Sequence, residues 1–212
     1  LTEPGNGGEG IVIHEGAQRN VIGGVEAGHR NIISHNVWAG VVIKDEGTMD
    51  NHVLGNFIGT DAGGTRPLGN QTEGVVIMAG ATYNHIGGPA SGSRNVIGAN
   101  SLGISIRDGD TMSNSVQGNY VGLDVSGLAE LGNRGNGIEI QSGASYNTIG
   151  GTTSASRNIA GGNEDSGISV YNSYSNTIAG NYVGLGVDGD TLFGNHGNGV
   201  VVAFSSHNRI EG

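Results

Sequence analysis

Several residue types are missing or scarce in this 212-residue chain, and each shortage excludes a class of protein. Cysteine is absent, which excludes a disulfide framework, a thiolate metal site and a cysteine nucleophile. With only 3 prolines, the chain is neither collagen nor a proline-rich linker. Charged residues make up 13% of the chain, against roughly 25% in an ordinary domain, which disfavours exposed helices and charged disorder. No apolar run reaches the length of a membrane-spanning helix.

Basic residues are the scarcer of the two charged classes. The chain has 9 Lys and Arg against 19 Asp and Glu, and the net charge of −10 argues against nucleic acids and anionic membranes as partners. Abundant instead are 43 glycines, 23 asparagines and an apolar set dominated by Ile and Val. Because β-branched residues favour strands, we expect a β-rich core built in small layers.

The chain is an internal repeat. A glycine followed by an apolar residue at the first and third positions recurs seven times, beginning at Gly10, Gly40, Gly74, Gly103, Gly137, Gly167 and Gly199. The spacings of 30, 34, 29, 34, 30 and 32 residues alternate between short and long. A larger unit of two turns is also visible, in Gly-Ala-x-x-Asn-x-Ile-Gly-Gly from Gly16, Gly80 and Gly143. Repeats of this length indicate a stacked architecture.

Asparagine follows the repeat in three registers. Of the 23 asparagines, 20 fall in these registers, which begin at Asn6, Asn20 and Asn31. Asparagine tolerates left-handed backbone at a corner, and its amide can donate to one neighbour of a stack and accept from the other. We therefore predict an all-β fold in one domain over residues 1–212: a single-stranded parallel β-helix (a solenoid) of three short sheets and about seven turns, with Asn ladders at its corners.

The motif Gly-Asn-[Phe/Tyr]-[Ile/Val]-Gly-[Thr/Leu]-Asp, at Gly55–Asp61 and Gly118–Asp124, resembles the right-handed β-helix repeats of pectate-lyase-like polysaccharide-processing proteins and bacterial surface arrays. The resemblance implies a right-handed helix, a secreted or cell-surface location and a polysaccharide or cell-surface glycan as partner. It does not select an activity, since that family includes lyases, hydrolases, epimerases and adhesins.

Period-two alternation leaves an apolar row on the outer side of the third sheet: Ile32, Phe57, Val96, Tyr120, Ile159 and Tyr182. Either the eleven-residue excursions that start at Thr60, Leu123 and Leu185 fold back over this row, or Phe57, Tyr120 and Tyr182 form a ladder that stacks on sugar rings. Arg30, Arg94 and Arg157 hold another register. They are either clamps on backbone carbonyls and on Asp61 or Asp124, or a comb that binds an acidic glycan.

The best catalytic cluster follows the first sheet, where Lys44, Asp45 and Glu46 lie two turns from Arg107, Asp108 and Asp110. A uronan lyase or epimerase needs a base and charge neutralisation, and a hydrolase needs two carboxylates. The register is not maintained in the other turns, so we interpret the cluster as a solvated corner.

Metal and ice-binding sites are not expected. Asp61, Asp124 and Asp188 in the long loops invite a calcium interpretation, but Ca²⁺ needs more oxygens than one or two carboxylates per loop provide. His52 and His85 share an outward row, yet zinc would need further ligands, so we expect surface histidines. The outward row of the first sheet, from Val12 to Val201, is too irregular for an ice-binding surface.

Regular turns and a uniform core favour a non-catalytic module: a structural spacer, an adhesin or a glycan-contact surface. The alternative is an extracellular polysaccharide lyase, epimerase or hydrolase. Because neither terminal turn shows a capping segment, we also expect end-to-end self-association or contacts with flanking domains of a longer array.

Overall fold

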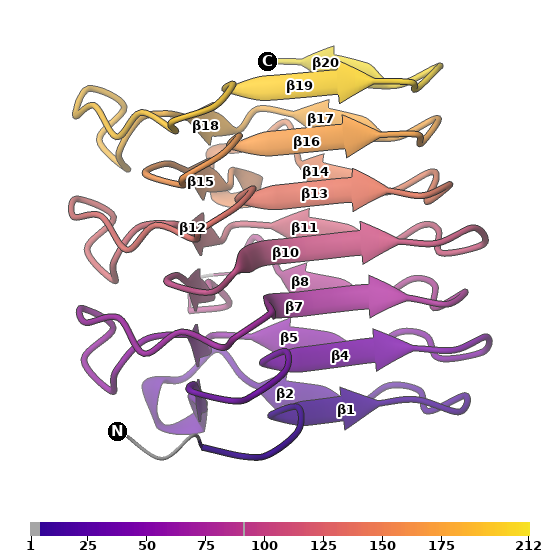
Figure 1. Ribbon diagram of the computed structural model, residues 1–212, viewed down its shortest axis with the longest axis horizontal. Coiled ribbons are helices and arrows are strands. Elements are labelled where there is room, and N and C mark those ends of the chain that lie inside the picture. The colour runs from indigo at the N-terminus through magenta and orange to yellow at the C-terminus, as the bar shows by residue number, and fades with distance from the viewer. Residues whose placement is uncertain (1–4, 91) are drawn as a thin grey trace.

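The chain winds as a stack of three-strand turns. The computed structural model describes residues 5–90 and 92–212. Each turn passes through one strand of each sheet, so equivalent strands of successive turns pair in parallel (Figure 1). Six turns are complete, from β1–β3 to β16–β18, and β19 and β20 belong to a seventh. The predicted three-sheet parallel β-helix is confirmed.

The strands of the three sheets follow one another in strict rotation. The first sheet contains β1 (Ile11–Ile13), β4 (Val41–Lys44), β7 (Glu73–Met78), β10 (Leu102–Arg107), β13 (Ile138–Gln141), β16 (Ile168–Tyr171) and β19 (Val200–Ala203). The second contains β2 (Val21–Gly23), β5 (His52–Leu54), β8 (His85–Gly87), β11 (Ser115–Gln117), β14 (Thr148–Gly150), β17 (Thr177–Ala179) and β20 (Arg209–Glu211). The third contains β3 (Ile32–Ile33), β6 (Phe57–Ile58), β9 (Val96–Ile97), β12 (Tyr120–Val121), β15 (Ile159–Ala160) and β18 (Tyr182–Val183).

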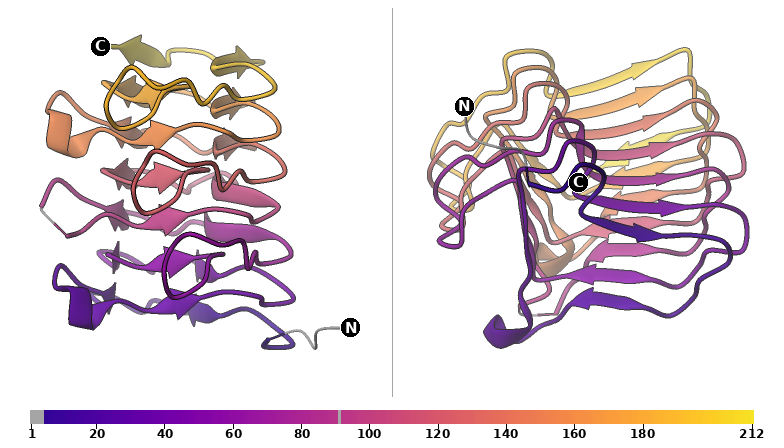
Figure 2. Two further views of the ribbon diagram at one scale, coloured as in Figure 1. Left: turned by 90° about the vertical axis from the view of Figure 1, so that its left-hand side faces the viewer. Right: turned by 60° about the horizontal axis from the view of Figure 1, so that its bottom comes forward.

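Two kinds of turn alternate, which explains the two-turn unit of the sequence. In the first, third and fifth turns the longer connection joins the second sheet to the third. It contains the 3-10 helix η1 (Ala27–His29) in the first turn and η2 (Ser154–Ser156) in the fifth. In the second, fourth and sixth turns it joins the third sheet to the first and protrudes as a loop (Figure 2). The described residues form no α-helix, and none of their helices could span a bilayer.

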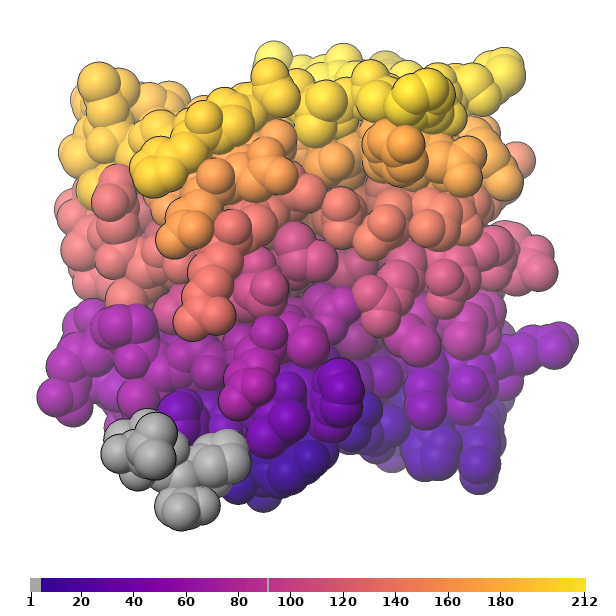
Figure 3. Space-filling model, viewed as in Figure 1, coloured from indigo at the N-terminus to yellow at the C-terminus, as the bar shows by residue number. Residues whose placement is uncertain are grey.

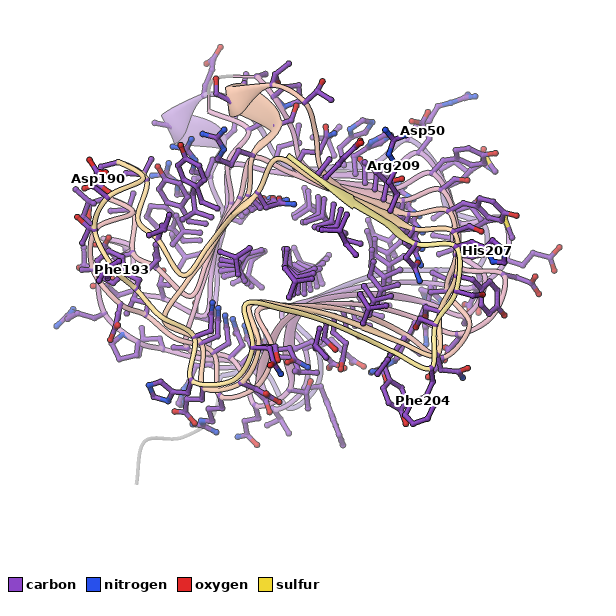
Figure 4. The ribbon with its side chains drawn as sticks, turned by 90° about the horizontal axis from the view of Figure 1, so that it is seen from above. Asp50, Asp190, Phe193, Phe204, His207 and Arg209 are labelled. Carbon is purple, nitrogen blue, oxygen red and sulfur yellow. The ribbon has the colours of Figure 1, made fainter. Side chains whose placement is uncertain are left out.

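The core is a set of stacked apolar rows. Ile43, Ile77, Ile106 and Ile140 of the first sheet are fully buried and face Val53, Ile86, Val116 and Ile149 of the second sheet and Ile58, Ile97 and Val121 of the third. Viewed along the axis, the inward side chains of successive turns superpose inside the ring (Figure 4). Register pairing puts like residues on top of one another, so each row is a continuous column with the strand periodicity of two.

Three asparagine ladders run the length of the stack, as predicted. In each ladder the amide Nδ2 donates to Oδ1 of the equivalent asparagine one turn further along, with N···O distances of 2.7–3.2 Å. The ladders are Asn6-Asn36-Asn70-Asn100-Asn133-Asn163-Asn195, Asn20-Asn51-Asn84-Asn114-Asn147-Asn176-Asn208 and Asn31-Asn56-Asn95-Asn119-Asn158-Asn181. Each interior member is buried, so the ladders satisfy polar groups that water does not reach.

The left-handed corners were assigned to the wrong residue. No ladder asparagine has a positive φ; in the second-sheet ladder the residue before it does, with φ of 55–59° at Arg19, Asp50, Tyr83, Ser113, Tyr146, Ser175 and His207. The ladder asparagine keeps its side chain inside the stack, so the reversal falls on its neighbour, whose side chain then projects outward. This corner geometry determines where Asp50 lies.

Candidate functional site

The outer face of the first sheet has a buried apolar floor. Val42 and Val76 point away from the core, yet both are buried, because they pack with Ala39 and the partly buried Met78. Figure 3 shows this face of the molecule, with the turns as layers in chain order.

An ion pair extends over the same face. Arg107 Nη1 lies 2.5 Å from Glu73 Oε1, and Arg107 Nη2 lies 3.5 Å from the Met78 sulfur. Glu73 opens β7 and Arg107 closes β10, so the two side chains must extend toward each other along the outer surface of the sheet. The pair therefore forms one wall beside the apolar floor.

The only tryptophan of the chain lies beside the same face. Trp38 lies in the connection from β3 to β4 and is 53% exposed. A shallow groove, which we call the Trp38 groove, is lined by Glu9, Trp38, Ala39, Val42, Lys44, Thr72, Glu73, Val76, Met78 and Arg107. Lys44 forms no ion pair within 4.0 Å among the described residues. The groove thus combines an exposed aromatic face, an apolar floor and charges of both signs.

Polar side chains follow Val76 in the outward row of the first sheet, beyond the groove. Glu139 lies one turn above Ser105, and its carboxylate accepts hydrogen bonds from Asn136 Nδ2 (3.1 Å) and Gln141 Nε2 (2.9 Å). Burial raises the pKa of Glu139, and the hydrogen bond from Asn136 and the charge of Arg107 oppose that shift. Ser105 Oγ is the one buried side-chain polar atom of the described residues that has no hydrogen-bond partner.

The structure divides the predicted catalytic cluster among three places. Lys44 and Arg107 line the Trp38 groove. Asp45 and Asp108 stand at left-handed corners, where Asp45 Oδ2 accepts from the Glu15 amide and Asp108 Oδ2 from the Ala79 amide, both at 3.3 Å. These two carboxylates therefore join neighbouring turns.

Glu46 and Asp110 lie apart from that groove. They line a separate depression at the corner between the first and second sheets, together with Gly47, Met49, Ala79, Gly80, Thr82 and Gly109. Between the turns of Glu46 and Asp110 the intervening turn contributes only Ala79, Gly80 and Thr82, so no third charged side chain lines this depression.

The third-sheet aromatic row is covered, as the first of our two alternatives predicts. Phe57 and Tyr120 are only 2% and 3% exposed and form a second apolar cluster with Leu123. The long loops fold back over them, so that a Cβ at Gly64 would lie 2.7 Å from the Phe57 ring. Figure 4 shows the last of these loops, with Asp190 and Phe193, on the outer side of the ring of strands. Neither Phe57 nor Tyr120 has a free face for a sugar, whereas Tyr182 is partly exposed.

The arginines are clamps. Arg30, Arg94 and Arg157 donate from Nε to the carbonyls of Gly55, Gly118 and Gly180 at 2.9–3.2 Å. Their guanidinium carbons lie 3.8–4.1 Å from the ring centroids of Phe57, Tyr120 and Tyr182. Each aromatic ring is thus held between a loop and an arginine of the preceding turn. No ion pair joins these arginines to Asp61 or Asp124 among the described residues, so the loop carboxylates are not part of the clamp.

The loop carboxylates bond to their own loops. Asp61 accepts from the amides of Thr65 and Arg66, and these bonds with the Arg66 side chain lower its pKa to about 2. Asp188 accepts from the amide and hydroxyl of Thr191, which lowers its pKa as well. Asp124 accepts from Ser126. These bonds are those of Asx turns.

Two features escaped the sequence analysis. Trp38 belongs to no repeat register, and its place in a groove depends on Glu73 and Arg107, which are 34 residues apart. Asp50 was not associated with His52 and His85, because its carboxylate reaches them only through the left-handed corner before the ladder asparagine. The sequence offered one signal for each feature: a single tryptophan outside the repeat registers, and two histidines in one register.

No protein-family model, no curated protein and no solved structure matches this chain. The resemblance to β-helix proteins therefore rests on the repeat and on the solenoid itself.

Proposed function

We propose that this chain is a non-catalytic β-helix module of a secreted or cell-surface protein, a spacer or adhesin that contacts a glycan at the Trp38 groove. The observation that supports this most is the exposed Trp38 ring beside the apolar floor of Val42 and Val76. Of the Arg-clamped aromatics, Phe57 and Tyr120 are covered, whereas Trp38 is exposed and lines a groove together with apolar and charged side chains.

The groove suits a sugar ring for physical reasons. The negative face of an indole attracts the positively polarised C–H groups on one side of a pyranose. Binding sites of this kind are mostly apolar with a few polar groups that fix orientation. Glu73 and Arg107 offer an acceptor and donors for hydroxyl groups, while Lys44 offers a cation for a uronic carboxylate.

A glycan array tests this proposal. We expect the wild-type chain to bind a subset of glycans and the Trp38→Ala variant to lose at least tenfold in affinity for them. Tyr146→Ala is the matched control, since Tyr146 is an exposed aromatic at the corner before the second sheet. Lys44→Gln should weaken binding of uronans more than of neutral glycans. The proposal fails if no glycan binds, or if Trp38→Ala and Tyr146→Ala bind equally well.

One observation favours the hydrolase alternative. Glu46 and Asp110 line one depression two turns apart, where the turns are roughly 9.6 Å apart along the stack, just above the about 6.5–9.5 Å between the carboxyls of inverting glycosidases. Reducing ends released from a glycan panel, and abolished by Glu46→Gln or Asp110→Asn, would establish this activity instead. Unsaturated ends would indicate a lyase. Asp45→Asn and Asp108→Asn are less informative, since those carboxylates bond to backbone amides.

A further inference from the structure

A second group of side chains lies on the outer face of the second sheet, away from the Trp38 groove. His52 of β5 and His85 of β8 are register partners on adjacent turns. Their rings stack, with centroids 4.6 Å apart and planes inclined by 16°. Asp50 precedes β5 at a left-handed corner with φ 57°, which turns its side chain outward (Figure 4).

We propose that Asp50, His52 and His85 form a binding site for a divalent transition-metal ion of the zinc type. One donor atom from each residue lies within 4.8 Å of the other two. Among the described residues no other group of three or more such side chains meets this condition. Two imidazole nitrogens and one carboxylate oxygen are the donor set that zinc takes in sites with an open position for water.

The three side chains make no hydrogen bond to one another, although the two histidine rings stack and His52 lies within ion-pair distance of Asp50. His52 Nε2 lies 3.5 Å from Asp50 Oδ1, which is beyond the 2.7–3.2 Å of a hydrogen bond. A tetrahedral ion with bonds of about 2.1 Å holds its donors roughly 3.4 Å apart. The aspartate and His52 already meet that separation. The remaining distances shorten by up to about 1.4 Å, which rotation of side chains at a half-exposed surface allows.

The surroundings orient each ligand. His85 Nδ1 lies 2.8 Å from the Ser115 hydroxyl of the next turn, which leaves Nε2 of that ring for the metal. Asp50 Oδ2 lies 3.5 Å from Arg19 Nε, so its other oxygen faces the histidines. Partners of this kind fix the tautomer and orientation of metal ligands. Leu54, Val25 and Pro89 line the hollow beside the pair and form an apolar wall.

The ion would join the second turn to the third through side chains, in addition to their backbone pairing. Because it binds only the folded stack, it should stabilise that stack by an amount that grows with the logarithm of its concentration over its dissociation constant. The site lies on a different sheet from the Trp38 groove, so the metal proposal stands independently of the glycan proposal.

Isothermal titration with Zn²⁺ tests this site, on a chain whose affinity tag has been removed. We expect one ion per chain, and an affinity at least about 100-fold lower in His52→Gln, His85→Gln and Asp50→Asn. Ser115→Ala should weaken binding about tenfold, in the range for groups that orient a ligand. The matched control is His14→Gln, because His14 also lies near two carboxylates, of Glu15 and Asp45, but has no histidine partner. It should bind as the wild type does.

Two further readouts guard against a variant that misfolds. Co²⁺ should give the intense visible bands of a tetrahedral site in the wild type and lose them in Asp50→Asn, whose folding is checked by circular dichroism. Zn²⁺ should raise the unfolding temperature of the wild type and of His14→Gln, but not of His52→Gln. Absence of binding up to millimolar Zn²⁺, or an affinity that His52→Gln and Asp50→Asn leave within twofold of the wild type, overturns the proposal.

Discussion

Each interior ladder asparagine uses its whole amide. Asn84 Nδ2 donates to Asn114 Oδ1 and to the Thr48 and Thr82 carbonyls, and Asn84 Oδ1 accepts from the amide nitrogen and side chain of Asn51. Deleting one amide removes these bonds and leaves donors and acceptors of both neighbours unpaired in a buried place. The ladders therefore hold successive turns in register, because each asparagine amide both donates to one neighbour and accepts from the other.

Asn84→Ala should lower the free energy of unfolding by roughly 1–3 kcal/mol, since unpaired buried groups cost about that much. Urea denaturation measures it. Asn198→Ala is the control, because Asn198 is exposed, belongs to no ladder and makes no side-chain hydrogen bond among the described residues. The control should stay within about 0.5 kcal/mol of the wild type. Equal effects of the two substitutions would contradict the role given to the ladders.

The lowered pKa of the Asp61 carboxyl group predicts that its loop is sensitive to acid. Hydrogen bonds from Thr65 and the Arg66 side chain lower its pKa from the ordinary 3.8 to about 2. A depressed pKa contributes stability that is complete above pH 3.8 and is lost as the pH falls toward 2. The Thr65 amide resonance, followed by NMR, should therefore titrate near pH 2 in the wild type and not at all in Asp61→Asn. A midpoint near 3.8 would show that the loop bonds do not hold the charge.

At the scale of elements, the loops and strands of two turns form one packing unit. A loop from an even turn covers the outer aromatic of its own third-sheet strand, and an arginine from the odd turn before it covers the other side. This arrangement explains why arginine and aromatic residues recur with the two-turn unit rather than with every turn. It also removes most of the aromatic row from solvent.

Arg94→Lys tests the clamp. Lysine cannot both stack on the Tyr120 ring and donate along the same line to the Gly118 carbonyl, as Arg94 does. We expect a loss of about 1–2.5 kcal/mol of unfolding free energy, from a cation–π contact of about 0.5–1 and a hydrogen bond of about 0.5–1.5. Arg134→Lys, at an exposed arginine, should change it by less than about 0.5 kcal/mol. If both variants lose equally, the clamp contributes nothing specific.

Sheet registers were predictable because they follow local rules. Ile104, Ser105 and Ile106 alternate with the strand period, and alignment of the Gly-apolar repeats at Gly103 and Gly137 puts Ile106 beside Ile140. The Trp38 groove was not predictable, since it depends on the length of a connection and on an ion pair between residues one turn apart. The position of Asp50 was not predictable either, because it depends on a left-handed backbone conformation that the residue type does not indicate.

At the scale of the whole molecule, the stack presents apolar side chains at its last turn. Val202 and Ile210 belong to inward rows, yet they are exposed here, and Phe204 is 80% exposed. The strands β19 and β20 pair with the preceding turn on one side only. Open edges of this kind pair with other chains unless a side chain or segment protects them.

The isolated 212-residue chain should therefore self-associate with increasing concentration. Light scattering coupled to size exclusion should show the molar mass rising above that of one chain, and Val202→Lys should reduce the rise. Tyr146→Lys, a charge added to the side of the stack, should leave it unchanged. A constant monomer mass across the series would mean that the edges are protected in another way.

We propose that the Trp38 groove is the surface that receives a glycan. Because Trp38 is the only tryptophan of the chain, its emission reports on this one place. The most direct measurement is a fluorescence titration with a glycan that the array identifies. We predict a saturable change in Trp38 emission, with a midpoint equal to the dissociation constant found by calorimetry. Calorimetric binding of that glycan with unchanged Trp38 emission would place its site elsewhere and contradict the claim.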